Sequence, residues 1–289
     1  MSHIVKHLGI VGAGTMGTAI AKLAILNGVE VLLYDINETI LRRGIERMKA
    51  EFRHSVQQEK MKPEESIAAL DLLKTRTALS DIGHCDLILE TVVEDLRVKQ
   101  DLLKHLDANA RPTTILATGT VTFSIASVAT YVKIPERIIG LHFFQPVETT
   151  QLVEIIRGNR TQAGVVEIAS SFAAALQKKP LLVQDTPGFL VTRTAFPFYS
   201  EALRLLGEHV ADAEQIDRIT KTIGGFSTGP FESLDRRGLD SFLTVAKSLY
   251  EQTYHEPRFR PQPLLKSMVD AGLLGKKSGK GFYTYEEEL

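Results

Sequence analysis

The sequence has little of three features that would indicate a cellular compartment or a kind of partner: cysteine, an excess of charge of one sign, and a long apolar run. Cys85 is the single cysteine, so no disulfide can form within the chain, and we expect a reducing compartment. Lys and Arg (34) nearly balance Asp and Glu (35), which argues against nucleic acid or a membrane surface as a partner. No apolar stretch approaches the roughly 18 residues of a membrane-spanning helix. The amino terminus has no signal or transit pattern, so we expect a cytoplasmic protein.

The first part of the chain alternates short β-rich runs with stretches of helical length. This alternation is typical of an α/β fold with a Rossmann-type, doubly wound parallel sheet. The charged stretch from Glu38 to Thr75 has apolar residues at helical spacing and is too long for a simple crossover, so we expect a projecting helical pair there. The predicted strands are HLGIVG (7–12), EVLLYD (30–35), CDLILETV (85–92), TTILATG (113–119), RIIGLHFF (137–144), LVEIIR (152–157) and PLLVQD (180–185).

The pattern changes after DTPGF, residues 185–189. From there it is helical, with helices predicted within 190–206, 212–224, 238–253 and 263–274. We therefore expect residues 1–185 to form the sheet domain, with the helical insertion at about 38–75. Residues 186–289 should form an all-helical domain.

The motif GAGTMG follows the first predicted strand and opens a helix. Its glycines fit the pattern G-x-G-x-x-G, in which they serve the tight turn, the close approach of a pyrophosphate and the packing of helix on strand. Asp35 ends the next predicted strand, where its carboxylate can bind ribose hydroxyls and would repel a 2′-phosphate, so NAD is favoured over NADP. The alternative is a glycine-rich turn that serves packing only. The expected cofactor residues here are Gly12, Gly14, Thr15, Met16, Gly17 and Asp35.

Several motifs occur in a fixed order across the chain: GAGTMG, HFFQP, DTPGFLVTR, GPFESLD followed by GLD, and GKKSGKGFY. Together they resemble the L-3-hydroxyacyl-CoA dehydrogenase family, which includes 3-hydroxybutyryl-CoA dehydrogenases. The resemblance implies a reversible, NAD-dependent oxidation of a short-chain (S)-3-hydroxyacyl-CoA to the 3-ketoacyl-CoA, a reaction of fatty acid metabolism and beta-oxidation. It also implies a homodimer made by the helical carboxyl-terminal domain.

The run GLHFFQPVETTQLVEII, residues 140–156, carries His142 in one apolar stretch and Glu154 in the next. A lone histidine in such a run is more often a structural residue. Oxidation of a secondary alcohol, however, needs a base within reach of the hydroxyl, and a carboxylate on the other ring nitrogen would fix the tautomer. Two parallel strands ending side by side would place the pair at the carboxyl edge of the sheet. The catalytic His and Glu of the family fall on these positions. Zinc is not expected, because no further His or Cys accompanies His142 at ligand spacing.

The resemblance implies further site residues, each with a plainer alternative. Glu94 and Lys99 match residues that border the nicotinamide end of the cofactor, and the alternative is a surface pair at a helix start. Lys277 matches a lysine that approaches the cofactor from the helical domain, and the alternative is a solvated basic turn. The 3′-phosphate of coenzyme A would meet basic residues of the helical pair, although such a charged run is usually a solvated face. The basic residues available there are Lys49, Arg53, His54 and Lys60.

Some positions depart from the family pattern. Thr118 keeps a hydroxyl for the substrate oxygen, but Gly119 replaces an asparagine beside it. Gln145 replaces a second asparagine near the cofactor, and Thr192 replaces a third at the substrate. Because a lost oxyanion-type donor can cost about 3 kcal/mol of transition-state stabilisation, the pocket is either rebuilt for another substrate or less active on ordinary thioesters.

Three functions therefore remain open. A 3-hydroxyacyl-CoA dehydrogenase is favoured by the agreement of whole motifs. A dehydrogenase of a free hydroxy acid, similar to L-gulonate 3-dehydrogenase or carnitine dehydrogenase, would not depend on the basic residues of the helical pair. A catalytically silent NAD-binding protein would bind NADH without turning over any substrate.

Overall fold

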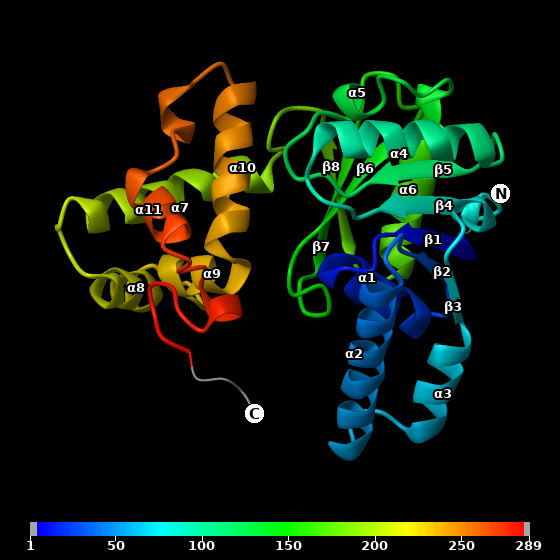
Figure 1. The fold of residues 1–289 in the computed structure, drawn as a ribbon, viewed down its shortest axis with the longest axis horizontal. Coiled ribbons are helices and arrows are strands. Elements are labelled where there is room, and N and C mark those ends of the chain that lie inside the picture. Colours follow the sequence, from blue (N-terminus) through cyan, green and yellow to red (C-terminus); the bar gives the residue numbers. More distant parts are fainter. Residues whose placement is uncertain (1–4, 286–289) are drawn as a thin grey trace. The chain divides into compact units, whose positions relative to one another are not determined.

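The computed structural model describes residues 5–285, and the chain divides into two compact units, Met1–Thr186 and Pro187–Leu289. Each unit has its own apolar core. Figure 1 shows the sheet of the first unit and the helices of the second.

The first unit is built on one sheet, which confirms the predicted α/β class. Within residues 5–285 eight strands are hydrogen-bonded in the order β3-β2-β1-β4-β5-β6-β7-β8. Neighbouring strands are parallel from β3 to β6, as in a Rossmann fold, and β1 and β4 flank the point where the strand order reverses. The strands are β1 (His7–Val11), β2 (Glu30–Tyr34), β3 (Leu73–Arg76), β4 (Leu87–Glu90), β5 (Ile115–Thr118), β6 (Ile138–Phe143), β7 (Leu152–Arg157) and β8 (Lys179–Gln184).

The last two strands reverse direction. β7 is antiparallel to β6, and β8 is parallel to β7. The expectation that the strands of His142 and Glu154 are parallel is therefore wrong. The connection between them, residues 144–151, is shorter than the dozen or more residues that a parallel crossover needs.

The expected helical pair is present as α2 (Glu38–Gln57) and α3 (Pro63–Asp71). Asn37 starts α2, because its side chain accepts hydrogen bonds from the amides of Thr39 and Ile40. The pair does serve as a crossover, contrary to expectation: it leads into β3, a strand that the sequence did not predict and that pairs in parallel with β2. β3 reads LKTR and lies at the sheet edge, so it lacks the apolar run of a central strand.

The other helices of the first unit cover the sheet. α1 packs on β2 and α2, and α6 packs on β6, β7 and β8. Their bounds are α1 (Thr15–Leu26), α4 (Leu96–Asn109), α5 (Ile125–Val128) and α6 (Ala163–Ala175), with short 3₁₀ turns η1 (Leu79–Ile82) and η2 (Pro135–Arg137).

The second unit is helical over its described residues, apart from isolated bridges at Lys280. α9 was not predicted, because it is short and lies between glycines. The helices are α7 (Val191–Gly207), α8 (Ala213–Thr222), α9 (Pro230–Arg237), α10 (Leu239–Gln252) and α11 (Pro263–Asp270), with 3₁₀ turns η3 (Pro257–Phe259) and η4 (Lys276–Ser278).

Two buried carboxylates join α8 and α9 to the carboxyl-terminal segment. Asp217 accepts the amides of Phe231 and Glu232 at the start of α9 and the Tyr283 hydroxyl, each at 2.9 Å. Asp235 accepts the amides of Phe282 and Tyr283 at 3.0 and 2.9 Å. These contacts show that the motifs GPFESLD and GKKSGKGFY meet in one place and hold the unit together.

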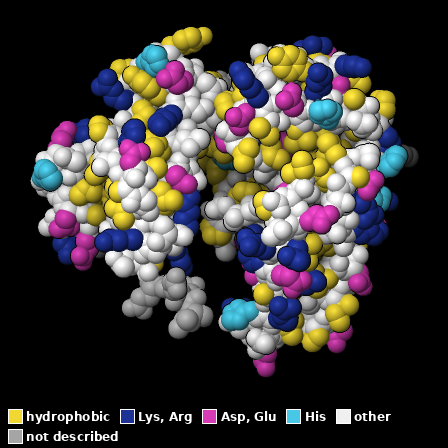
Figure 2. Space-filling view, in the orientation of Figure 1, with side chains coloured by type: hydrophobic (Ala, Val, Ile, Leu, Met, Phe, Trp, Pro, Cys, Tyr) yellow, Lys and Arg dark blue, Asp and Glu magenta, His cyan; other side chains and the backbone are white. Residues whose placement is uncertain are grey.

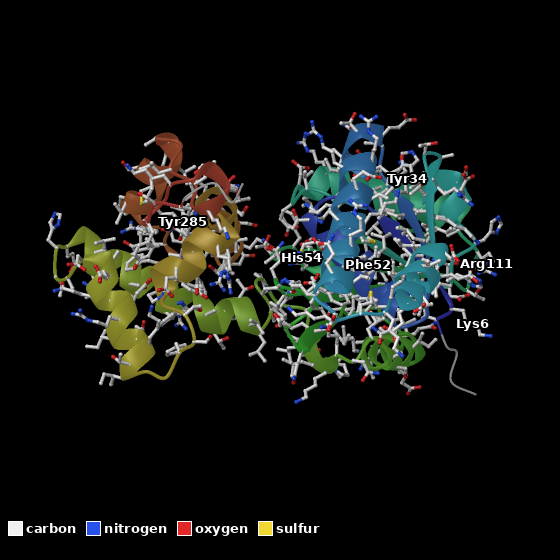
Figure 3. All side chains as sticks on the ribbon, turned by 90° about the horizontal axis from the view of Figure 1, so that it is seen from below. Lys6, Tyr34, Phe52, His54, Arg111 and Tyr285 are labelled. Carbon is white, nitrogen blue, oxygen red and sulfur yellow. The ribbon has the colours of Figure 1, made fainter. Side chains whose placement is uncertain are left out.

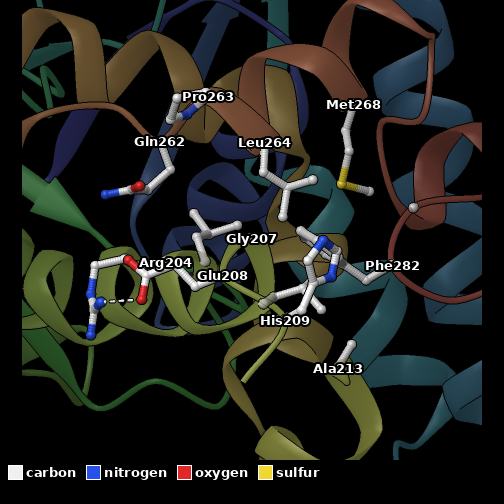
Figure 4. Close-up of a pocket in the computed structure, with 13 residues that line it drawn as sticks. Arg204, Gly207, Glu208, His209, Ala213, Gln262, Pro263, Leu264, Met268 and Phe282 are labelled. Atoms are coloured by element: carbon white, nitrogen blue, oxygen red, sulfur yellow. Dashed lines mark hydrogen bonds and ion pairs between the residues drawn. The ribbon is translucent and has the colours of Figure 1, made fainter. Parts of the chain in front are cut away.

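A pocket of about 730 Å³ opens in the second unit between the end of α7 and α11 (Figure 4). Its walls are largely apolar, and an ion pair between Arg204 and Glu208 lies beside it. Across residues 5–285, no helix is long and apolar enough to cross a membrane.

Candidate active site

The glycine-rich turn joins β1 to α1 with a different constraint at each glycine. Gly12 has φ +103°, and a Cβ there would lie 3.0 Å from the Thr91 carbonyl oxygen. A Cβ at Gly17 would lie 1.8 Å from the Gly12 carbonyl oxygen, so helix and turn touch there. A Cβ at Gly14 would meet no atom within 4 Å, because this residue borders open space. The turn is therefore packed at its first and third glycines and accessible at the second.

The accessible side of this turn fits a dinucleotide. Gly14 is the residue before α1 and makes no side-chain cap, so Thr15 and Met16 begin the helix with amides available to an anion. Asp35 follows β2, and its carboxylate accepts the Ala13 amide at 2.8 Å. The acidic residue and the glycine turn are thus adjacent, as NAD binding requires.

His142 and Glu154 face each other across β6 and β7. They are direct partners in the antiparallel register, and His142 Nδ1 lies 2.7 Å from Glu154 Oε2. Both side chains are buried, with 8% and 0% of their surface exposed. The Phe144 ring lies 4.4 Å from the imidazole. The predicted pair is therefore formed, by cross-strand pairing and not by two parallel strand ends.

A buried polar network lies at the ends of β4 and β5. The sequence did not single out Glu90, which is fully buried and accepts both the Thr118 hydroxyl and the Lys99 ammonium, the latter at 2.9 and 3.0 Å. Lys99 is 1% exposed and also lies 3.3 Å from Glu94. The alternative of a surface pair is therefore wrong for Lys99. Glu90 is an acidic residue at the end of an otherwise apolar strand, and this is the signal that could have indicated it.

Glu94 orders the loop that follows β5. Its Oε1 accepts the Thr120 hydroxyl at 2.6 Å and the amides of Val121 and Thr122 at 2.8 and 3.0 Å. Burial opposes its ionisation, but the Lys99 ammonium and these hydrogen bonds outweigh burial and hold the pKa of Glu94 below its usual value. Burial likewise opposes the charge of Lys99, yet Glu90 and Glu94 raise the pKa of this ammonium.

The departures from the family pattern have local structural consequences. The Thr118 hydroxyl donates to Glu90, so its proton is used inside the network and not offered to a substrate oxygen. A Cβ at Gly119 would lie 2.9 Å from the Glu90 carbonyl oxygen, which explains why this backbone path carries glycine. Gln145 is exposed in the loop after β6.

The basic residues of the helical pair lie on an exposed face. Arg53 is exposed on α2. The neighbouring Phe52, labelled in Figure 3, is 1% exposed and belongs to the apolar core. Lys49 pairs with Glu46 at 3.0 Å. Figure 2 shows acidic as well as basic side chains on this pair. The face is accessible to an anion but carries charges of both signs.

The remaining predicted residues belong to the second unit. Thr192 lies in the first turn of α7 and is partly exposed. The Lys277 ammonium lies 2.6 Å from an Asp240 carboxylate oxygen. The Lys277 side chain is half-exposed, which agrees with the alternative that this segment is a basic turn in contact with solvent.

Two family models match the chain over nearly its whole length. The model described as "3-hydroxyacyl-CoA dehydrogenase, NAD binding domain" matches residues 7–186, and that described as "3-hydroxyacyl-CoA dehydrogenase, C-terminal domain" matches residues 188–285. The chain belongs to the 3-hydroxyacyl-CoA dehydrogenase family. NAD is the cofactor of this family's amino-terminal domain, as the glycine turn and Asp35 predict.

Individual relatives cover the chain almost completely. A 3-hydroxybutyryl-CoA dehydrogenase of Bradyrhizobium diazoefficiens is 36% identical over 285 residues, 99% of this chain and 97% of that protein. A 3-hydroxyadipyl-CoA dehydrogenase of Escherichia coli is 38% identical over 98% of this chain, which spans 60% of that relative's length. The crystal structure of (S)-3-hydroxybutyryl-CoA dehydrogenase PaaH1 from Ralstonia eutropha is similar with a TM-score of 0.91, at 34% identity, covering 98% of this chain and 100% of that one. The resemblance seen in the motifs is confirmed.

Proposed function

We propose that this protein oxidises the 3-hydroxyl group of a short-chain (S)-3-hydroxyacyl-CoA to the 3-ketoacyl-CoA, reversibly and with NAD. The observation that carries the proposal is the buried hydrogen bond between His142 and Glu154, in the unit that also carries the dinucleotide turn. His142 is the general base, and Glu154 is the carboxylate that orients it.

The chemistry of the pair follows from its hydrogen bond. A carboxylate can only accept, so the bonded Nδ1 carries the proton and the lone pair of neutral imidazole lies on Nε2. Nε2 takes the proton of the substrate hydroxyl, and Glu154 stabilises the imidazolium that forms. In the reverse direction the imidazolium returns this proton to the oxygen. NAD, when bound, supplies the acceptor of the hydride.

The glycine turn and Asp35 hold the cofactor in this proposal. The amides at the start of α1 bind the phosphates, and Asp35 binds the ribose hydroxyls. Glu94 and the loop it orders border the nicotinamide end, with Lys99 fixing Glu94 from within the fold. Gln145 takes the place of an asparagine beside this site.

The substrate contacts are proposed from the family pattern. Arg53 on α2 meets the 3′-phosphate of coenzyme A, supported by its exposure. Thr192 and Lys277 contribute from the helical unit. Thr118 is fully buried and its proton is committed to Glu90, so it supports the network beside the site and makes no direct bond to the substrate oxygen.

The proposal is tested by a panel of keto substrates with NADH and NADPH. The panel holds acetoacetyl-CoA, 3-oxoadipyl-CoA, a longer 3-ketoacyl-CoA, and free keto acids without the coenzyme. We expect the highest kcat/KM with acetoacetyl-CoA and NADH. Turnover of free acids alone would favour the hydroxy-acid alternative, and tight NADH binding without any turnover would favour a silent protein.

We also propose that the helical unit makes a homodimer. Ile219 on α8 is 59% exposed, and Ile223 and Phe226, which follow the end of this helix at Thr222, are 83% and 51% exposed. Large apolar side chains that are exposed near one another in the sequence are candidates for an interface. A second copy of this chain is the partner that the family resemblance implies.

A further inference from the structure

Lys178 is a buried lysine whose hydrogen bonds go to main-chain oxygens. Its ammonium donates to the carbonyls of Val147, Glu148 and Thr150 at 2.6, 3.2 and 2.9 Å. The residue is 7% exposed, so these bonds replace much of the water it would have. An ammonium has three protons, and here each one has its own carbonyl.

The three carbonyls belong to one loop, residues 144–151, which joins β6 to β7. This loop begins at Phe144, whose ring contacts the imidazole of His142, and it includes Gln145. Its own hydrogen bonding is slight: the Thr150 amide donates to the Pro146 carbonyl at 3.0 Å. Val147 is 2% exposed, and a buried carbonyl without a partner is costly, so the Lys178 ammonium supplies a needed donor from outside the loop.

The reversal of β7 and β8 explains why Lys178 reaches the loop. β8 runs parallel to β7, with Lys179 opposite Leu152, so both strands start at the edge where β1 and β4 to β6 end. Lys178 precedes β8 and therefore lies at the edge that also carries His142. The Lys179 amide donates to the Gln151 carbonyl at 2.6 Å, which ties the end of the same loop.

A second lysine holds the loop from α1. Lys22 lies 3.4 Å from the Glu148 carboxylate and 2.6 Å from Glu51 on α2, with a side chain 14% exposed. The main chain of Glu148 is thus bound by Lys178 and its carboxylate by Lys22. The loop is anchored from β8 and from the dinucleotide-binding helix at the same residue.

We propose that Lys178 is a positioning residue for the reaction: it holds the 144–151 loop in the conformation that keeps the Phe144 ring against the imidazole of His142. The expected loss of activity rests on the proposed function, whereas the anchoring of the loop by Lys178 does not depend on it. Burial lowers the pKa of Lys178 and Glu148 opposes this effect, as expected for an ammonium solvated mainly by carbonyl dipoles. A neutral side chain of similar length would leave three loop carbonyls without their donor.

The test compares Lys178→Met with Lys179→Met, since Lys179 is the adjacent lysine and its side chain is exposed. Four quantities are measured for each variant: kcat and KM with acetoacetyl-CoA, the dissociation constant of NADH, and hydrogen–deuterium exchange of the peptides across the chain. For Lys178→Met we expect kcat to fall by about 10- to 100-fold, because a small displacement of site residues costs that much. NADH affinity should not change, and faster exchange should be confined to residues 144–152.

Lys178→Arg and Lys179→Arg form a second pair in case the methionine variant does not fold. A planar guanidinium cannot direct three protons at three converging carbonyls, so Lys178→Arg should be intermediate between wild type and Lys178→Met. Exchange and kcat equal to those of the Lys179 controls would overturn the proposal. So would faster exchange throughout the first unit with loss of NADH binding, which would indicate a general role in stability. If the wild type turns over no thioester, the proposed function fails, while exchange still decides whether Lys178 holds the loop.

Discussion

At the scale of single residues, the three glycines of the nucleotide turn have separable roles. Gly17 is required by packing, since any side chain would overlap the Gly12 carbonyl. Gly14 has free space around it in the protein. Its requirement for glycine would therefore come from the ligand and not from the fold.

A pair of alanine variants separates these two requirements. We expect Gly14→Ala to keep the urea unfolding midpoint of wild type but to bind NADH about tenfold more weakly, because the methyl group enters the space of the pyrophosphate. Gly17→Ala should lower the midpoint as well, because α1 must move away from the turn. Titration of NADH and urea unfolding of each variant measure the two effects. Equal NADH affinity in Gly14→Ala and wild type would contradict this assignment.

Glu94 provides a prediction that depends on pH. Its pKa in the folded protein is lowered, so its ion pair and hydrogen bonds stabilise the fold above the unfolded-state pKa of about 4.3. This stabilisation is lost as the pH falls through the folded-state value. Glu94→Gln should therefore unfold at a lower urea concentration than wild type at pH 7, and the difference should shrink below about pH 4. A difference that stays constant over this range would exclude the ionised Glu94 as its source.

At the scale of elements, the sequence predicts the helices and strands that are determined by residues close together in the chain. The βα alternation, the glycine turn and the helical texture after residue 186 are local, and the strands β1, β2 and β4 to β8 follow from them. β3 was missed because an edge strand carries charged residues. The direction of β7 could have been predicted from the connection between β6 and β7, which is too short for a parallel crossover. The expectation of two parallel strand ends did not take this length into account. Burial of Lys99 and Lys178 was not predictable, since a lysine in sequence indicates a surface.

The carboxyl-terminal segment supplies a prediction for the helical unit. Asp235 is 1% exposed and accepts two amides and the Tyr285 hydroxyl at 3.0 Å. Asp235→Asn replaces an acceptor by an amide donor that faces other donors, so we expect a loss of about 2–3 kcal/mol in the stability of this unit. Urea unfolding followed by exchange of peptides from α9 and residues 275–285 would measure it. Asp270→Asn, at an exposed position of α11, is the control and should have no effect.

At the scale of the whole molecule, the charge is nearly balanced, and the described residues contain no membrane-spanning helix. The evidence for function therefore comes from the site residues. The candidate residues are distributed over both units: the base, its carboxylate and the nucleotide turn lie in the first, and Thr192 and Lys277 in the second. Motifs in both units could be assigned from sequence because each is specific by its order in the chain. Neither composition nor motif order indicates which acyl chain the site accepts.

The proposed dimer makes a prediction at this scale. Ile223→Lys places a charge at the most exposed of the three apolar side chains Ile219, Ile223 and Phe226 and should shift the protein from dimer to monomer in sedimentation velocity. Tyr254→Lys adds the same charge at a residue that is 95% exposed and does not belong to this group, and it should leave the dimer intact. A monomeric wild type, or an Ile223→Lys variant that sediments like the control, would contradict the assignment of this surface.

The central claim is that His142 transfers the proton of the substrate hydroxyl. The most direct measurement is the rate of NADH oxidation by acetoacetyl-CoA in wild type and His142→Ala, with NADH affinity determined for both. We predict turnover by wild type, a fall in kcat of about 10²- to 10⁴-fold in His142→Ala, and unchanged NADH affinity, because His142 lies outside the glycine turn. A His142→Ala variant as active as wild type would contradict the account. So would wild-type protein that binds NADH but does not oxidise it with acetoacetyl-CoA.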